Sequence, residues 1–461
     1  MSSDLFRVYE HIVDASHIRG FPRTTSTTQN EVLQLSVKQY TPHENPNPKP
    51  GDITVIAAHA NGFPKELYEP LWDELLKTSK QQGFSIRGIW IADVVHQGRS
   101  GVLNEHKLGN DPAWLDHSRD LLHVVNTFRK QMPRPIFGVG HSMGGAQLAH
   151  LAILHPRLFE SLILFDPVIQ RMVSVSGNIS PALSSAMRRD RWPSREDAAK
   201  SMMRNPFYQA WNPRVFERWI QYGLRDLPTA LYPDSAASPG PVPAAISAEP
   251  TLAPAASKSK EVTLTTTKHQ EVMTFLRPNF PYREGDKEPS SAEYTASNPS
   301  INRRTHPDLS AGPLPQAPFY RGESMMVFQQ LPHLRPSVLY VFGSKSFLTM
   351  HTENITEKME NTGVGVGGSG GAKEGRVSQV MVQDAGHLIP MEKVEESASH
   401  AAMWIGKEMQ RWRINEKLTE EEWGNRKGVE RSVLTERFLE ELKETGKKGL
   451  PAVKKERDAK L

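Results

Sequence analysis

Short apolar runs alternate along the chain with segments whose apolar residues recur at helical spacing. Runs of five to seven residues rich in Val, Ile, Leu and Phe predict strands buried on both faces. Between the first two runs, Leu71, Leu75 and Leu76 recur as on one face of a helix. This alternation predicts an α/β fold with a mostly parallel sheet flanked by helices. The predicted buried strands are residues 53–58, 86–91, 136–140, 161–165, 337–343 and 377–382.

Two other patterns divide the chain. Polar and apolar residues alternate over residues 31–40, which predicts a half-buried strand. The strand–helix alternation then stops from residue 168 until residue 335. We expect this segment to form a cap over the carboxyl ends of the strands, with helices in 171–231 and one short helix in 262–280. The predicted parts are a core (1–167 and 336–412), the cap (168–335) with an Ala/Pro/Ser-rich insert (234–260), and a charged tail (413–461).

The central motif is Gly140-His141-Ser142-Met143-Gly144, which joins a predicted strand to a predicted helix. It fits the G-x-S-x-G nucleophile elbow, in which a strained turn exposes the Ser hydroxyl and the flanking glycines relieve close contacts. The alternative is a Gly-rich loop with an incidental Ser. The strand before it and the helix after it favour the elbow, so Ser142 is the candidate nucleophile.

A nucleophilic Ser needs a base and a carboxylate that orients the base. His387 follows the last predicted strand, which is where this architecture places its base. An acid is expected soon after the strand 337–343, but the sequence there is Ser344-Lys345-Ser346-Phe347. We therefore predict Asp166 as the acid, because it ends the strand next to that of the nucleophile. Asp384 is the alternative, and Asp166 could instead cap the first cap helix.

Two backbone amides should bind the oxyanion that forms during the reaction. Met143 supplies one at the start of the elbow helix, and the turn Ala60-Asn61-Gly62 supplies the other, with Asn61 preferred over Ala60. Of the 17 His, we expect His59, His96 and His141 to line or brace the site without acting as the base, and His269 to lie elsewhere.

These motifs together resemble the α/β-hydrolases. The resemblance rests on residues 59–64, on Asp93 with residues 96–100, on residues 140–144 and on residues 386–390. A narrower resemblance, carried by residues 37–42, 268–270, 331–337 and 459–461, is to fungal peroxisomal esterase/lipases, including the host-selective toxin biosynthesis hydrolases and the yeast peroxisomal lipase. The family commonly places its acid after the strand 337–343. Some lipases place it where Leu164-Phe165-Asp166-Pro167 stands here.

Composition narrows the class of protein. The 461 residues carry 56 Lys plus Arg and 52 Asp plus Glu, so the net charge of +4 gives no argument for nucleic acid. The absence of Cys excludes disulfides, thiolate metal sites and a Cys nucleophile. No spacing predicts a metal or another cofactor, and the Gly-rich run 363–371 is expected to be a flexible loop rather than a phosphate site. We predict neither a secretory signal nor a transmembrane segment.

The combined prediction is a serine hydrolase of carboxylic esters that works through an acyl-enzyme. An acyl-CoA thioesterase or acyltransferase would use the same residues, and a catalytically silent binding protein is the alternative of another class. The resemblance implies a peroxisomal lipid or toxin-biosynthesis pathway. The end Ala459-Lys460-Leu461 is a close variant of a peroxisomal address and should bind the import receptor. The cap residues that could contact an apolar acyl group, or form cap core, are Met202, Met203, Phe207 and Trp211.

Overall fold

The computed structural model describes residues 2–171, 175–233, 260–280, 285, 292–295, 298–309, 318–350 and 352–448. The chain divides into a first unit, Met1–Glu408, and a second unit, Met409–Leu461. The boundary lies close to the predicted start of the tail at residue 413. Nearly all of the predicted insert 234–260 and the end Ala459-Lys460-Leu461 lie outside the described residues.

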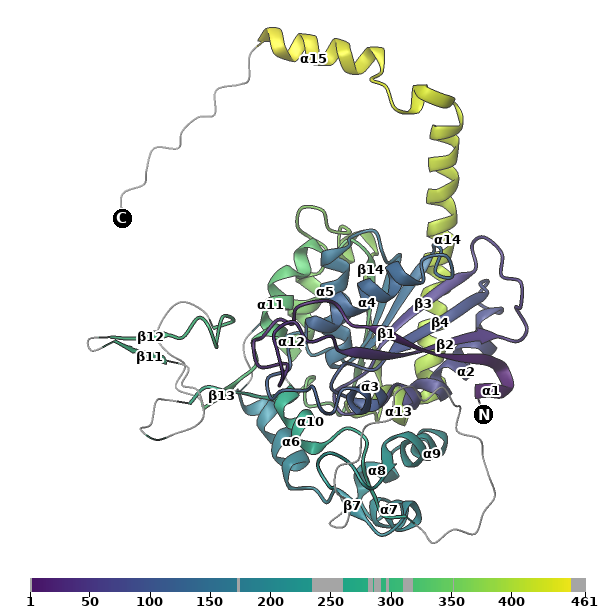
Figure 1. Ribbon diagram of the computed structural model, residues 1–461. Coiled ribbons are helices and arrows are strands. Elements are labelled where there is room, and N and C mark those ends of the chain that lie inside the picture. Colours follow the sequence, from purple (N-terminus) through teal and green to yellow (C-terminus); the bar gives the residue numbers. More distant parts are fainter. Residues whose placement is uncertain are drawn as a thin grey trace. The chain divides into compact units, whose positions relative to one another are not determined.

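An eight-stranded sheet forms the centre of the first unit, in the order β1-β2-β4-β3-β5-β6-β14-β15 (Figure 1). The six strands β4, β3, β5, β6, β14 and β15 run parallel to one another, whereas β2 pairs antiparallel with β4 and β1 pairs antiparallel with β2 at one edge. The mostly parallel α/β fold predicted from the sequence is therefore confirmed. The strands are β1 (Phe6–Asp14), β2 (Gln34–Pro42), β3 (Ile53–Ala58), β4 (Ile86–Ala92), β5 (Ile136–His141), β6 (Ser161–Phe165), β14 (Ser337–Gly343) and β15 (Val377–Val382).

The inner strands are mostly apolar because helices cover both faces of the sheet. Every residue of β3, β5, β6 and β14 is buried. Alternate side chains, such as Ile56, Leu162 and Tyr340, join one core cluster with the elbow helix α5 (Met143–Leu154). On the opposite face, Trp404 of α14 (Val394–Gly424) donates to Ser161 of β6 at 2.7 Å. The other α-helices of the core are α1 (Ser2–Leu5), α2 (Glu69–Ser79), α3 (Gly98–Leu103), α4 (Asp116–Thr127), α11 (Glu323–Gln330), α12 (Thr352–Asn361) and α13 (Ile389–Glu392), and the 3-10 helix η1 (Lys65–Tyr68) precedes α2.

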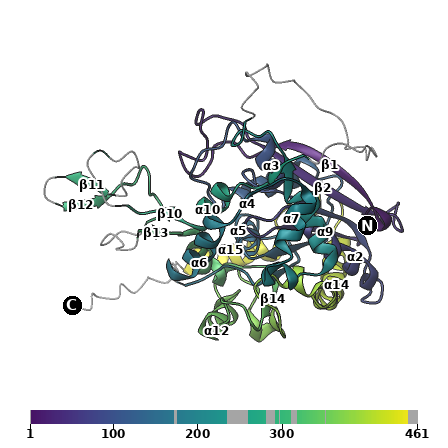
Figure 2. The same ribbon diagram turned by 90° about the horizontal axis from the view of Figure 1, so that it is seen from below.

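The segment after β6 forms the cap, which lies in front of the sheet in Figure 2. Its helices surround a small three-stranded sheet of order β7-β9-β8. Residues 171–231 are therefore not helical throughout as predicted, because short strands interrupt the helices. Residues 262–280 begin with a strand before the predicted helix. The cap elements are α6 (Val175–Met187), β7 (Arg191–Trp192), α7 (Arg195–Met202), α8 (Pro206–Gln209), α9 (Pro213–Tyr222), β8 (Leu224–Asp226), β9 (Val262–Leu264) and α10 (Lys268–Phe275).

Beyond α10, two further strand pairs precede α11. One pair joins β10 (Arg277–Pro278) to β13 (Phe319–Tyr320), and the other joins β11 (Ala292–Thr295) to β12 (Asn298–Ile301). The second unit contains the end of α14 and α15 (Glu436–Lys448). Among the helices that the structure describes, none combines the length and apolar character needed to span a bilayer.

Three local features differ from the sequence expectation. Strand β1 was not predicted, because an edge strand half exposed to solvent has no continuous apolar run. Helix α14 continues to Gly424, well beyond residue 412, where the predicted core ends. The Gly-rich loop 363–371, expected to be flexible, is fastened by backbone hydrogen bonds: Gly363 N–H donates to Leu331 O at 2.8 Å, and Ser369 N–H donates to Leu334 O at 2.9 Å.

Candidate active site

Ser142 occupies the sharp turn between β5 and α5. Its φ of 56° and ψ of −117° lie in a region that non-glycine residues rarely adopt, so the backbone is strained there. The flanking glycines allow the turn to close: a Cβ on Gly144 would lie 2.2 Å from Ala58 O, and one on Gly140 would lie 2.8 Å from Gly144 O. The motif therefore has the geometry of a nucleophile elbow.

Ser142, His387 and Asp166 form a continuous hydrogen-bonded chain. The Ser142 hydroxyl donates to His387 Nε2 at 2.8 Å, and His387 Nδ1–H donates to Asp166 Oδ2 at 2.6 Å. The Asp166 side chain is fully buried, whereas the His387 side chain is 20% exposed. This order of nucleophile, base and carboxylate is the arrangement that activates a Ser hydroxyl. The structure thus brings together the three residues that the sequence singled out, and their catalytic roles stay a prediction.

The carboxylate of Asp166 has a second donor that sequence reasoning missed. Ser346 Oγ–H donates to Asp166 Oδ2, the same oxygen that accepts from His387. Ser346 is buried in the loop after β14, where the family commonly places its acid. The position of Ser346 in the sequence could have indicated this contact. A Ser on the loop that commonly carries the acid lies close enough to donate to an acid supplied by another loop.

The alternative acid, Asp384, stands apart from the base. Its side chain is 73% exposed and pairs with Lys345 at 2.9 Å. That ion pair lowers the pKa of the Asp384 carboxyl. Asp384 does precede His387 by three residues, but its positive φ of 54° belongs to a surface turn. The geometry therefore favours Asp166 over Asp384.

The turn after β3 offers one amide toward the site. Ala60 N–H donates to Tyr68 Oη at 2.9 Å, and Gly62 N–H donates to Gln97 Oε1 at 2.7 Å. The Asn61 amide between them has no hydrogen-bond partner among the described residues, and neither has the Met143 amide at the start of α5. These two free amides are the pair that the sequence predicts as oxyanion donors, and Ala60 is already engaged.

The remaining candidate histidines are not placed to act as the base. His59 and His141 are buried in the turn and the elbow, where burial lowers the pKa of both, that of His141 to about 3. His96 Nε2 lies 2.8 Å from Thr274 Oγ1 of the cap, and burial lowers its pKa as well. His269 is exposed on α10. The first three are therefore neutral bracing groups near neutral pH.

Helix α10 of the cap is fastened directly to the oxyanion turn. Asn61 Nδ2 donates to Glu271 O at 3.1 Å, and Gln97 Nε2 donates to Asn61 Oδ1 at 2.7 Å. The Glu271 carboxylate in turn accepts from Ser185 Oγ of α6 at 2.6 Å and from Arg188. The Asn61 side chain is thus used for cap docking, whereas its backbone amide stays a predicted oxyanion donor.

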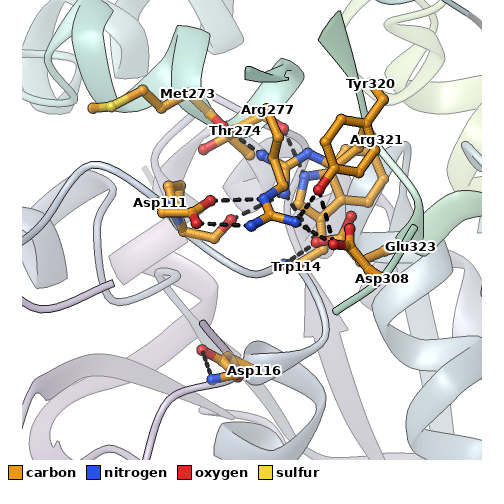
Figure 3. Close-up of polar contacts among 12 residues, drawn as sticks. Asp111, Trp114, Asp116, Met273, Thr274, Arg277, Asp308, Tyr320, Arg321 and Glu323 are labelled. Carbon is orange, nitrogen blue, oxygen red and sulfur yellow. Dashed lines mark hydrogen bonds and ion pairs between the residues drawn. The ribbon is translucent and has the colours of Figure 1, made fainter. Parts of the chain in front are cut away.

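A buried ionic cluster holds the chain that follows α10 to the core (Figure 3). Arg277, 2% exposed, forms a bidentate pair with Asp111, in which Nε and Oδ1 are 2.7 Å apart and Nη2 and Oδ2 are 2.8 Å apart. It also contacts Asp308 and Tyr320. Loss of one partner from such a cluster would leave a buried charge uncompensated, which typically costs about 3–5 kcal/mol. The cap is therefore anchored both through α10 itself and through the chain just after it.

The cap residues proposed as acyl contacts divide into two groups. Met202 and Trp211 are buried, and Trp219 Nε1 donates to Met202 Sδ at 3.2 Å, so they belong to the core of the cap. Met203 and Phe207 are about half exposed. Phe347, which is 40% exposed, lies at the site itself, with its ring centroid 5.0 Å from that of His387.

Comparisons with known proteins agree with this geometry. A family profile described as serine aminopeptidase, S33, matches residues 68–212, which include the elbow. The type I acyl-CoA thioesterase mpaH of Penicillium roqueforti is 43% identical over 450 residues, covering 96% of both chains. Its namesake in Penicillium brevicompactum is 41% identical over 456 residues, covering 97% of this chain and 98% of the relative.

The fold matches that of a solved hydrolase. The peroxisomal α/β-hydrolase Lpx1 of Saccharomyces cerevisiae superposes with a TM-score of 0.60 at 15% identity, covering 92% of this chain and all (100%) of the other. The protein belongs to the α/β-hydrolases. This α/β-hydrolase is also 25% identical over 277 residues to the abhydrolase domain-containing protein AFT2-1 of Alternaria alternata, covering 60% of this chain and 85% of the relative. The family predicted from the sequence is thereby confirmed, together with a fold of the serine-hydrolase type.

Proposed function

We propose that this α/β-hydrolase is a serine-dependent acyl-CoA thioesterase. The observation that carries the proposal is the chain from Ser142 through His387 to Asp166. Ser142 Oγ attacks the acyl carbonyl carbon, and its proton passes to His387 Nε2. The C–S bond then breaks, and the leaving thiolate takes that proton. A water molecule, deprotonated by His387, releases the acid and restores Ser142.

The free amides of Asn61 and Met143 support the same mechanism. An acyl-transfer reaction places negative charge on the former carbonyl oxygen, and two preorganised N–H donors stabilise that charge. Met143 opens α5, so the partial positive charge of the helix N-terminus lies at the same place. The half-exposed Phe347 beside His387 offers an apolar contact for an acyl chain.

The choice of thioester over carboxylic ester rests on the relatives. The sequence alone put carboxylic esters first and thioesters second, because the triad serves both. The two Penicillium relatives, which align over nearly their whole length, carry the name acyl-CoA thioesterase. This supports thioesters as the better substrates, with esters as slower ones.

A substrate panel tests the proposal. Release of free CoA from short, medium and long acyl-CoA thioesters is followed with a thiol reagent, alongside p-nitrophenyl esters of the same acyl groups. We expect higher kcat/KM for thioesters, and loss of turnover and of fluorophosphonate labelling in Ser142→Ala. Retained turnover in Ser142→Ala would contradict the serine mechanism. Faster ester hydrolysis would return the assignment to an esterase, and absence of both activities and of labelling would indicate a silent binding protein.

The peroxisome is the proposed location. The support is the terminal Ala459-Lys460-Leu461, a variant of the Ser-Lys-Leu address that an import receptor reads. A fluorescent protein fused ahead of the full chain should give punctate fluorescence that coincides with a peroxisomal marker. Deletion of the three residues should make it diffuse, and puncta that persist would contradict the proposal. A peroxisomal lipid or secondary-metabolite pathway would then supply the substrate.

A further inference from the structure

The peptide group that carries the free Asn61 amide is held at its carbonyl oxygen, and the Tyr68 hydroxyl holds the N–H of the peptide before it. Ala60 N–H donates to Tyr68 Oη at 2.9 Å, and Ala60 C=O accepts from His59 Nδ1 at 2.8 Å. This peptide is trans, so its N–H and C=O point in opposite directions. A fixed Ala60 carbonyl therefore aims the Asn61 N–H the other way, which determines where an oxyanion can be bound.

The partners of the two buried histidines define which ring nitrogen carries the proton. His59 Nε2 accepts from Val94 N–H at 2.9 Å, so the proton of this neutral ring is on Nδ1. His141 Nε2 lies 2.9 Å from His387 O, which can only accept, so His141 carries its proton on Nε2. Because burial lowers the pKa of His141 to about 3, its Nδ1 is unprotonated and accepts from Tyr68 Oη–H at 2.8 Å.

We propose that Tyr68 and His141 form a directed hydrogen-bond relay that positions the oxyanion amide and the catalytic base with respect to Ser142. The relay runs from Ala60 N–H to Tyr68 Oη, from Tyr68 O–H to His141 Nδ1, and from His141 Nε2–H to the His387 carbonyl. Neither Tyr68 nor His141 contacts a reacting atom, so both are positioning residues. Their effect on turnover rests on the proposed function.

The relay joins the three chain segments that supply reacting groups. Ala60 belongs to the oxyanion turn after β3, His141 precedes the nucleophile in the elbow, and His387 follows β15. Tyr68 is 2% exposed and His141 is 1% exposed, so water does not substitute for a lost partner. Removal of the Tyr68 hydroxyl would leave Ala60 N–H and His141 Nδ1 buried and unpaired, and both segments could shift. Displacements of about 1 Å are enough to cost about 100-fold in rate.

Tyr68→Phe is the first test, with Tyr340→Phe as the matched control. Tyr340 is also buried, and its hydroxyl lies 2.7 Å from Thr362 Oγ1 within the core, away from the relay. We expect Tyr68→Phe to lower kcat about tenfold or more with KM within about twofold, since the amide acts on the transition state. Tyr340→Phe should lower the unfolding temperature similarly and leave kcat unchanged. Equal kcat losses in both variants, or none in Tyr68→Phe, would overturn the relay.

A pair of substitutions at His141 tests the direction of the relay. The Gln amide can donate to the His387 carbonyl and accept from Tyr68, whereas Leu can do neither. We expect His141→Gln to retain most of the kcat that His141→Leu loses. Equal losses of kcat in the two variants would contradict a hydrogen-bond role for His141 and would show that its ring acts only through packing.

Ring tautomers give a readout that is independent of activity. NMR of the full-length protein with 15N-labelled histidine at neutral pH should show His59 protonated on Nδ1 and His141 on Nε2, with assignments from His59→Gln and His141→Gln. The opposite tautomer at His141, or a charged ring there, would overturn the relay. A wild-type protein without hydrolase activity would refute the proposed function, while the tautomers would still decide the hydrogen-bond order.

Discussion

The loops that follow β6 and β14 begin side by side, and a side chain from each lies at the same hydrogen bond. One loop contributes a carboxylate, and the other contributes a hydroxyl that donates to it. Phe165 pairs with Val341 in the sheet, so both loops leave the same edge. The β6 loop supplies the Asp166 carboxylate, and the β14 loop supplies the Ser346 hydroxyl that donates to it. Since the carboxyl ends of adjacent parallel strands open together, an acid on either loop could reach His387. We therefore expect that a carboxylate on either loop can occupy the position that Asp166 has beside His387.

The chain after β14 carries a hydrogen-bond donor and a cation near the Asp166 carboxylate, and the acid itself comes from the loop after β6. Lys358 of α12 is 1% exposed, and its Nζ donates to Asn354 O at 3.1 Å. Burial lowers the pKa of Lys358 to about 8, while the nearby charge of Asp166 acts in the opposite direction. The chain after β14, where the family commonly has its acid, thus carries the Ser346 hydroxyl and the buried Lys358 ammonium instead.

The largest expected effect comes from removing the charge on the β6 loop. Asp166→Asn should lower kcat about 10³–10⁴-fold, because an amide cannot stabilise the protonated His387 or hold its tautomer. KM should change little. Stopped-flow or steady-state assays with the best substrate of the panel give kcat, and thermal unfolding checks that the fold is intact. A loss below about tenfold would show that another group supports His387.

Moving the acid between the loops tests whether position in space is sufficient. The double variant Asp166→Ala, Ser346→Asp places a carboxylate on the β14 loop, where the common family pattern has it. We expect it to recover at least about tenfold in kcat over Asp166→Ala, because the partner of His387 is charged again. The comparison variant is Asp166→Ala, Ser346→Asn, which has the same shape without the charge. Equal activity of the two double variants would contradict the interchange.

Removing the Ser346 hydroxyl alone should have a smaller effect. Ser346→Ala leaves Asp166 and its bond to His387 in place but removes a buried donor to the same oxygen. We expect kcat to fall about three- to tenfold, because one hydrogen bond contributes about 0.5–1.5 kcal/mol net. Ser344→Ala is the matched control on the same loop, because Ser344 is exposed and accepts from Asp384 N–H at 3.0 Å. Equal losses in both variants would indicate a general loop effect.

Replacing the buried ammonium of Lys358 should change the free energy of unfolding rather than turnover. Because the pKa of Lys358 is lowered to about 8, the unfolded chain binds more protons than the folded chain between about pH 8 and the ordinary value of 10.5. Lys358→Met should therefore raise the unfolding free energy at pH 7, by on the order of 3 kcal/mol. This difference should shrink as the pH rises through that window.

Denaturant unfolding at pH 7, 9 and 10.5 measures the effect of Lys358→Met. The control is Lys345→Met, since the Lys345 side chain is 66% exposed and should show no such pH trend. A pH-independent difference, or destabilisation at pH 7, would show that Lys358 is held favourably by Asp166.

The parts predicted well from the sequence are those determined by local pattern. The runs at β3 and β14 are mostly apolar and are buried at every residue, and the elbow needs Gly140 and Gly144 for close packing, so each left a short-range signature. Strand β1 left none, because its pairing with β2 is decided by partners that lie 20 to 36 residues away along the chain. The cap strands β7 to β9 are two or three residues long, too short for a periodic pattern.

Contacts between distant segments could not be predicted in the same way. Ser346 and Asp166 are 180 positions apart, and the donor on the β14 loop follows only from the three-dimensional positions of the two loops. The relay through Tyr68 and His141 likewise joins residues 73 positions apart. For the same reason, the sequence could not exclude Asp384 as the acid. Asp384 is only three residues from His387, but the direction of its side chain cannot be predicted from the sequence.

The smallest expected effect on turnover comes from Asp384, the alternative acid that the geometry does not favour. Asp384→Asn should leave kcat and KM within about twofold, because the carboxylate is 73% exposed and its partner is Lys345 rather than His387. Stability should change by less than about 1 kcal/mol, as is usual for exposed ion pairs. Measured beside Asp166→Asn under the same conditions, the pair gives a difference of several hundredfold or more if Asp166 alone supports the base. A large loss in Asp384→Asn would mean that the loop before His387 moves during the reaction and brings the second carboxylate to the imidazole.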